Sequence, residues 1–167
     1  MDQLEPPDSH HLRAALGWLG LGNRTEASAE LEAISAANRQ HSDVLEVRWT
    51  IYAGEQKWDE ALVAARDILS RRPDEPEGWL HYAYALRRAK KGGLKQAWGL
   101  LRPIAEKFPQ EPVIAFNLAC YACQLEEMAE ARDWLKRACA IGGKKHIKQM
   151  ALADTDLEPL WDEIQKL

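Results

Sequence analysis

The chain has 167 residues, of which 46% are hydrophobic and 29% are charged. It contains 22 Lys and Arg and 26 Asp and Glu, which gives a net charge of −4. These values predict one globular domain, exclude a disordered chain, and give no general attraction to nucleic acid or to an anionic membrane. Three cysteines cannot form a complete disulfide framework, and without a signal-peptide pattern or an apolar run of about 18 residues the cytoplasm is the expected location.

Apolar residues recur along the chain at the three-to-four-residue spacing of amphipathic helices, and no segment shows the alternation of a strand. Turn signals at 22–23, 72–76 and 108–112 divide this pattern into segments. The sequence therefore predicts eight helices in four hairpins, at 9–21 with 24–38, 43–54 with 58–71, 77–91 with 94–108, and 113–125 with 128–141.

A different pattern follows Gly142 and Gly143, where the segment 144–152 predicts one more short helix. Asp154 and Asp156 can cap the start of a final helix. One stripe of that helix carries apolar side chains, at Leu157, Leu160, Trp161, Ile164 and Leu167. We interpret 144–167 as a C-terminal cap that covers the open apolar face of the last hairpin.

The four hairpins share a repeated spacing. An alanine opens the second helix of each, with intervals of 34, 36 and 34 residues between Ala27, Ala61, Ala97 and Ala131. Each of these alanines is followed four and seven positions later by apolar or small side chains. A period of this length predicts stacked repeats, at about 8–41, 42–75, 76–111 and 112–143, within a single domain that spans 1–167.

This period, two helices per unit, the alanine position and a closing proline together resemble the tetratricopeptide repeat (TPR) family. The segment 45–73, with Tyr52, Trp58 and Pro73, carries the resemblance best, and the tail MALADTDLEPLW resembles that of uncharacterised bacterial members. The resemblance implies an all-α, right-handed α-solenoid of about four TPR hairpins with a C-terminal capping helix. It also implies a non-enzymatic scaffold or adaptor, and the chain contains no P-loop, HExxH or GxSxG motif.

The resemblance further implies a concave groove, lined by the first helix of each repeat, that binds a peptide or a segment of a partner protein. The register assigns six residues to this groove, namely Leu80, Tyr84, Arg87, Phe116, Asn117 and Gln124. Among them we expect Tyr84 and Phe116 to anchor the partner, Arg87 to pair with an acid, and Asn117 to bond its backbone. Leu12, Leu16 and Leu19 suit either the groove or a dimer surface, so homo-oligomerisation stays open.

The charge of the third repeat and the identity of the bound partner leave alternatives open. The third repeat is basic, with Arg88, Lys90, Lys91 and Lys95, which indicates either a site for an acidic partner or a solvated face. A second functional hypothesis is a small chaperone or adaptor for a secreted or assembling client.

Cys120 and Cys123 raise a third hypothesis, a thiol- or zinc-binding protein, in which Cys139 and His146 would complete a ligand set. Both cysteines fall inside a predicted helix, and free cysteine is commonly a small buried residue, so packing is the favoured interpretation. We predict no metal, no cofactor and no catalytic residue.

Overall fold

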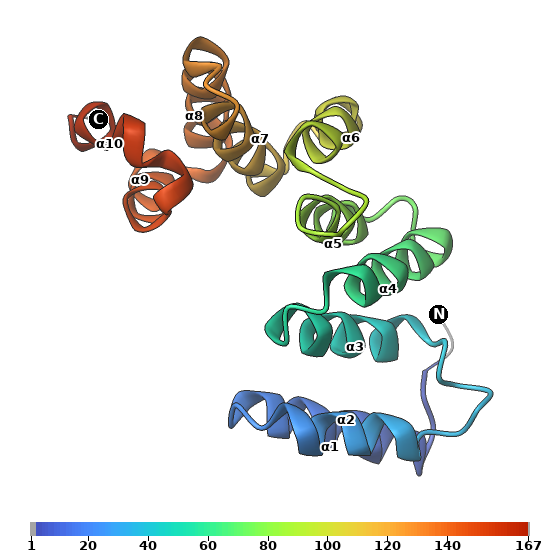
Figure 1. Ribbon diagram of the computed structural model, residues 1–167. Coiled ribbons are helices and arrows are strands. Elements are labelled where there is room, and N and C mark those ends of the chain that lie inside the picture. The colour runs from blue at the N-terminus through green and yellow to red at the C-terminus, as the bar shows by residue number, and fades with distance from the viewer. Residues whose placement is uncertain (1–2, 167) are drawn as a thin grey trace. The chain divides into compact units, whose positions relative to one another are not determined.

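The computed structural model describes residues 3–166, and none of these residues forms a strand (Figure 1). The helices are α1 (Asp8–Gly20), α2 (Arg24–Ala33), α3 (Ser42–Gly54), α4 (Trp58–Arg71), α5 (Pro76–Leu86), α6 (Leu94–Lys107), α7 (Pro112–Gln124), α8 (Met128–Gly142), α9 (Lys144–Ala153), the 3₁₀ segment η1 (Thr155–Leu160) and α10 (Trp161–Gln165). The predicted all-α helical repeat fold is confirmed. The chain divides into two compact units, unit 1 (Met1–Ala85) and unit 2 (Leu86–Leu167). None of the described helices has the length and apolar character needed to cross a membrane.

Most helix boundaries lie within two residues of the predicted ones because local signals determine them. Asn23 begins α2 by accepting a hydrogen bond from the backbone N–H of Glu26 at 3.2 Å. Pro112 occupies the first turn of α7, where its missing N–H costs nothing. Asp154 acts as an N-cap, as predicted, by accepting a hydrogen bond from the backbone N–H of Asp156 at 2.9 Å, but the helix that it begins is the 3₁₀ segment η1 and the single final helix that we predicted is divided into η1 and α10.

Unit 1 contains two helical hairpins, α1 with α2 and α3 with α4, followed by most of α5 (Figure 1). Ala15 on α1 and Ala27 on α2 are fully buried, which lets these two helices approach closely. The surrounding core includes Leu4, Leu31, Ile34, Val44, Val47 and Ile51. Leu12 and Leu19 pack against this core, whereas Leu16 is 53% exposed.

The second helix of unit 1 is shorter than predicted, ending at Ala33 instead of residue 38. Ile34 is extended, with ψ of 137°, and its side chain is buried. The cause is Asp8, a buried side chain at the start of α1. Its carboxylate accepts hydrogen bonds from the Ser35 backbone N–H at 2.9 Å, the Ser35 hydroxyl at 2.5 Å and the Asn38 amide at 2.7 Å. These bonds hold the chain in a turn where a helix would otherwise continue.

The helix that begins at Pro76 also ends early, at Leu86 instead of residue 91. The backbone N–H of Gly93 donates to the Leu86 carbonyl oxygen at 3.0 Å, which closes a turn. Gly92 lies so close to the same oxygen that a Cβ at position 92 would stand 1.8 Å from it. Only glycine fits this approach, and the chain consequently leaves the helix at Leu86.

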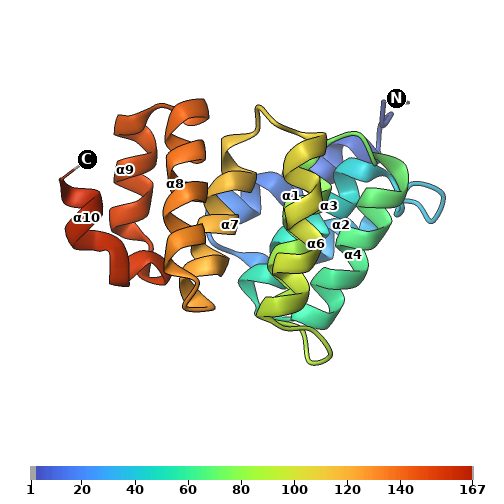
Figure 2. The same cartoon turned by 90° about the horizontal axis from the view of Figure 1, so that it is seen from above.

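Unit 2 is organised around α7, which packs against α6, α8 and η1. Nine of its thirteen residues are buried, so α7 has no solvent-facing stripe. The helices α8, α9 and α10 lie side by side beyond it (Figure 2). The apolar stripe of the cap is buried as predicted at Leu157, Leu160 and Ile164, while Leu167 lies outside the described residues.

Candidate binding surfaces

An aromatic cluster joins three helices of unit 1 and contains one of the predicted groove residues. The Tyr84 ring, on α5, meets Trp49 of α3 and Trp58 of α4 edge to face, with ring centroids 6.2 and 5.8 Å apart. Trp49 also stacks on His81, with centroids 3.8 Å apart and planes inclined by 15°. Tyr84 is 38% exposed, and Leu80 on the same helix is half-buried. We name Trp49, Trp58, His81 and Tyr84 the aromatic cluster.

A polar pair orients this cluster. The His81 Nε2 and the Glu46 carboxylate are hydrogen-bonded at 2.7 Å, which joins α5 to α3. The indole N–H of Trp49 is buried and has no hydrogen-bond acceptor among residues 3–166. Aromatic rings fixed in this way offer flat apolar area together with a few hydrogen-bonding groups, the combination that protein interfaces use most.

In unit 2, the predicted groove residue Arg87 is engaged by the C-terminal cap. Its guanidinium makes two hydrogen bonds to the Asp156 carboxylate, one of them from Nη2 to Oδ1 at 2.9 Å, and the other very short. The guanidinium also lies over the Tyr121 ring, 5.4 Å from its centroid. Hydrogen bonding to Asp156 raises the pKa of Arg87. The acid that the sequence leads us to expect from a partner is thus found within the chain.

The other three groove candidates of unit 2 are also held by neighbours within that unit. Gln124 donates its amide to the Asp156 carbonyl at 3.0 Å, and Asn117 donates to the Val113 carbonyl at 2.9 Å. Phe116 is 6% exposed. Leu80 and Tyr84 belong to unit 1, so one groove formed by all six residues stays a prediction.

The thiols are buried or half-buried, and burial raises the pKa of Cys120, of Cys123 and of Cys139. Cys120 Sγ lies 3.6 Å from Asp154 Oδ2, and together with Asp156 these residues form the only group of potential metal ligands close enough to share an ion among residues 3–166. That group does not include the other two cysteines or His146, which is exposed. A raised pKa also disfavours the thiolate that a metal requires.

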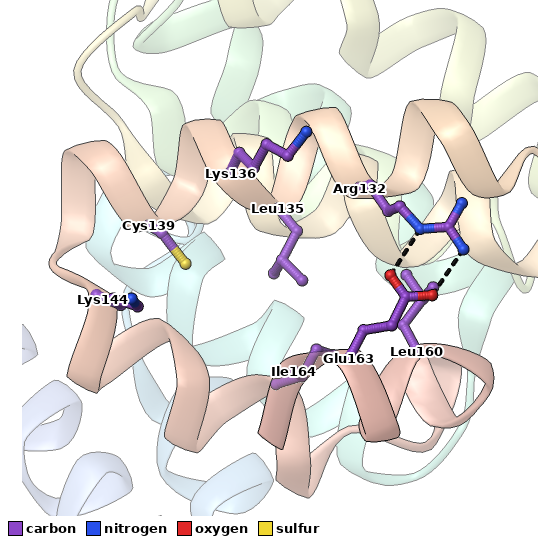
Figure 3. A pocket seen from close by; sticks show the side chains of 8 residues that line it. All are labelled: Arg132, Leu135, Lys136, Cys139, Lys144, Leu160, Glu163 and Ile164. Atoms are coloured by element: carbon purple, nitrogen blue, oxygen red, sulfur yellow. Dashed lines mark hydrogen bonds and ion pairs between the residues drawn. The ribbon is translucent and has the colours of Figure 1, made fainter. Parts of the chain in front are cut away.

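An apolar pocket of about 210 Å³, absent from the sequence predictions, lies between α8 and the C-terminal cap (Figure 3). Its lining residues are Arg132, Leu135, Lys136, Cys139, Lys144, Leu160, Glu163 and Ile164. Arg132 and Glu163 form a bidentate ion pair at one end of it, with both N–O distances at 2.7 Å. The sequence shows the apolar stripe of the cap but carries no signal that links Arg132 with Glu163.

The residues of the predicted basic patch belong to unit 2. Lys90, Lys91 and Lys95 are exposed, and Arg88 is half-buried. Counted by unit, Met1–Ala85 contains 8 Lys and Arg against 15 Asp and Glu, a net charge of −7, whereas Leu86–Leu167 contains 14 against 11, a net charge of +3. The positive charge of unit 2 is confined to the third repeat, because residues 86–111 contain 7 Lys and Arg against 2 Asp and Glu, whereas residues 112–167 contain 7 against 9.

Comparisons with known proteins establish the fold and no more. No protein-family model matches the chain, and no curated protein sequence matches it either. Among solved structures, the chain is similar to TTC0263, a thermophilic TPR protein in Thermus thermophilus, with a TM-score of 0.67 and 19% identity over 96% of this chain and 100% of that one. It is also similar to MamA MSR-1 C2, with a TM-score of 0.63 and 17% identity over 97% of each chain. The chain thus has the helical repeat fold of TPR proteins.

Proposed function

We propose that the chain is a non-enzymatic module that binds a peptide or a segment of a partner protein through the first helices of its repeats. The fold supports a protein-interaction module in general, and the observation that carries the proposal is the aromatic cluster of unit 1. Tyrosine and tryptophan dominate the binding energy of protein interfaces because they bury large areas at low cost in side-chain entropy. Tyr84 keeps 38% of its surface exposed while two tryptophans hold its ring.

The polar groups of the aromatic cluster hold its rings in a fixed orientation for the proposed partner. The bond between His81 and Glu46 fixes the imidazole against Trp49, so these side chains have little rotamer freedom left to lose when a partner binds.

The predicted groove residues of unit 2 have structural roles in this proposal and are not its partner contacts. Arg87 positions the C-terminal cap, and the buried Phe116 supports α7, so neither is a sound place to test partner binding. Exposed aromatic surface in unit 1 is the better target. Whether such a module serves as an adaptor or as a chaperone for a secreted or assembling client depends on the partner that it captures.

The test is quantitative affinity capture with the wild-type chain and with Tyr84→Ala. Tyr82→Ala is the matched control, because Tyr82 lies on the same helix but takes no part in the ring contacts of the aromatic cluster within the described residues 3–166. We expect Tyr84→Ala to reduce recovery of the specific partner about tenfold or more, as interface hot spots do, and Tyr82→Ala to preserve it. Circular dichroism confirms that both variants keep their helices. Equal recovery by the wild-type chain and Tyr84→Ala would refute the proposal.

A further inference from the structure

The pocket between α8 and the C-terminal cap has the size and lining of a site for one apolar side chain (Figure 3). Leu135, Leu160 and Ile164 are at most 5% exposed and form its apolar surface, and Cys139 lies on the α8 side. Apolar cavities of about 150 Å³ stay dry and accept a benzene-sized guest. The volume here, about 210 Å³, therefore accommodates the side chain of a leucine or a phenylalanine. All lining residues belong to unit 2.

Among residues 3–166, the ion pairs at the rim leave the ammonium of Lys144 without a counterion. Arg132 and Glu163 neutralise each other, and Arg132 lowers the pKa of Glu163. The Nζ of Lys136 lies 3.2 Å from Oδ1 of Asp133, so these two side chains form a second ion pair. Lys144, in contrast, has no acidic partner within ion-pair distance in the part of the chain that the structure describes. Burial raises the pKa of the Cys139 thiol, and the positive charge of Lys144 partly opposes this rise. The Lys144 ammonium therefore lies at the Cys139 end of the pocket.

We propose that the pocket anchors a partner segment in which a Leu- or Phe-sized side chain enters between Leu135 and Ile164 while an adjacent acidic side chain pairs with Lys144. This inference rests on the general part of the proposed function, that the chain binds partner segments, and it adds a second contact site on α8 and the C-terminal cap. The positive charge of Lys144 selects an acidic neighbour over a basic one. The apolar surface selects a bulky side chain over a small one.

Blocked dipeptides separate these two requirements. The probes are acetyl-Phe-Glu-amide, acetyl-Phe-Lys-amide and acetyl-Ala-Glu-amide at millimolar concentration. The measurement is the rate at which iodoacetamide alkylates Cys139 at pH 8.5, followed by peptide mass spectrometry, with the buried Cys120 and Cys123 as internal references. We expect the Phe-Glu probe to protect Cys139 at a concentration about two- to fivefold lower than the Phe-Lys probe, the range for an exposed ion pair. The Ala-Glu probe should give no protection.

Charge reversal at the rim sharpens the test. Lys144→Glu should invert the preference between the Phe-Glu and Phe-Lys probes, whereas Lys145→Glu, at the neighbouring exposed lysine outside the lining, should leave it unchanged. Both substitutions place an acid in the first turn of α9, where the helix dipole favours it, so both variants should fold. Each variant's protection is normalised to its own alkylation rate without a dipeptide, which removes any direct effect on the thiol.

Three results would overturn the inference. The first is that no dipeptide protects Cys139, and the second is that both charge reversals act alike. The third is that Leu167→Ala accelerates alkylation in the absence of any probe, because the chain's own last side chain would then be the occupant. The dipeptide assay does not depend on Tyr84. If no dipeptide protected Cys139 while Tyr84→Ala still reduced partner capture, the pocket would be rejected as an anchor and the proposed function would stand.

Discussion

Replacing Arg87 with methionine removes the contact that ties the loop after α5 to the C-terminal cap. Methionine keeps the length of the side chain and its apolar stem but loses both hydrogen bonds to Asp156. The two charged side chains are only 17% and 22% exposed, so Asp156 would lose its partner in a poorly solvated place. A hydrogen bond to a charged group contributes about 1.5–3 kcal/mol, and partial exposure weakens the pair, so we expect the free energy of unfolding of unit 2 to fall by about 2 kcal/mol.

Thermal unfolding and a double-mutant cycle measure this effect. For a unit of this size, about 2 kcal/mol corresponds to a lower melting temperature of roughly 8–16 °C. The cycle combines Arg87→Met with Asp156→Asn, and the exposed Lys91→Met in the same loop serves as the control, with an expected change within about 0.5 kcal/mol. If the effects of Arg87→Met and Asp156→Asn simply added, the two side chains would not be coupled. Arg87 would then not hold the cap, and it would not be withdrawn from partner binding.

Other predictions concern packing, pH and thiol chemistry. Ala119→Leu should destabilise unit 2 by about 1–3 kcal/mol in urea unfolding, because Ala119 is fully buried on α7, while Ala129→Leu on the exposed side of α8 should change it by less than about 0.5 kcal/mol. Hydrogen bonds from Ser35 lower the pKa of Asp8 in the folded chain, so its stabilising contribution is present above the unfolded value of about 3.9 and is lost as the pH falls through the folded value. The melting temperatures of the wild-type chain and Asp8→Asn should therefore differ less at pH 3 than at pH 7. Burial raises the pKa of the Cys120 thiol, so at pH 8 it should react with a thiol reagent more slowly than the half-buried Cys139, and equal rates would contradict the burial described here.

The parts of the fold that the sequence predicts well are those set by neighbouring residues. The range 58–71 predicted for the fourth helix is the one observed, because Trp58 follows a turn and Pro73 ends the following segment. Asp154 is recognisable as a cap for the same reason, since its partner Asp156 is only two residues away. Signals of this kind act within one helical turn and are visible without a structure.

The features that the sequence does not predict depend on residues far apart in the chain. The early end of α2 is caused by Asp8, 27 residues before Ser35. The pairing of Arg87 with Asp156 spans 69 residues, and no periodic pattern connects a loop with a cap at that distance. A groove role assigned to Arg87 from register alone could not take this internal acid into account.

The burial of α7 on every side has a consequence for the synthesis of the chain. The helix is complete at Gln124, but one of the elements that cover it, η1, ends only at Leu160. At about 5–20 residues per second, the ribosome needs roughly 2–7 s to add the intervening segment. Until that segment has been added, α7 has no polar face and lacks one of the elements that cover it. The synthesis of the C-terminal cap therefore determines when α7 can become fully covered.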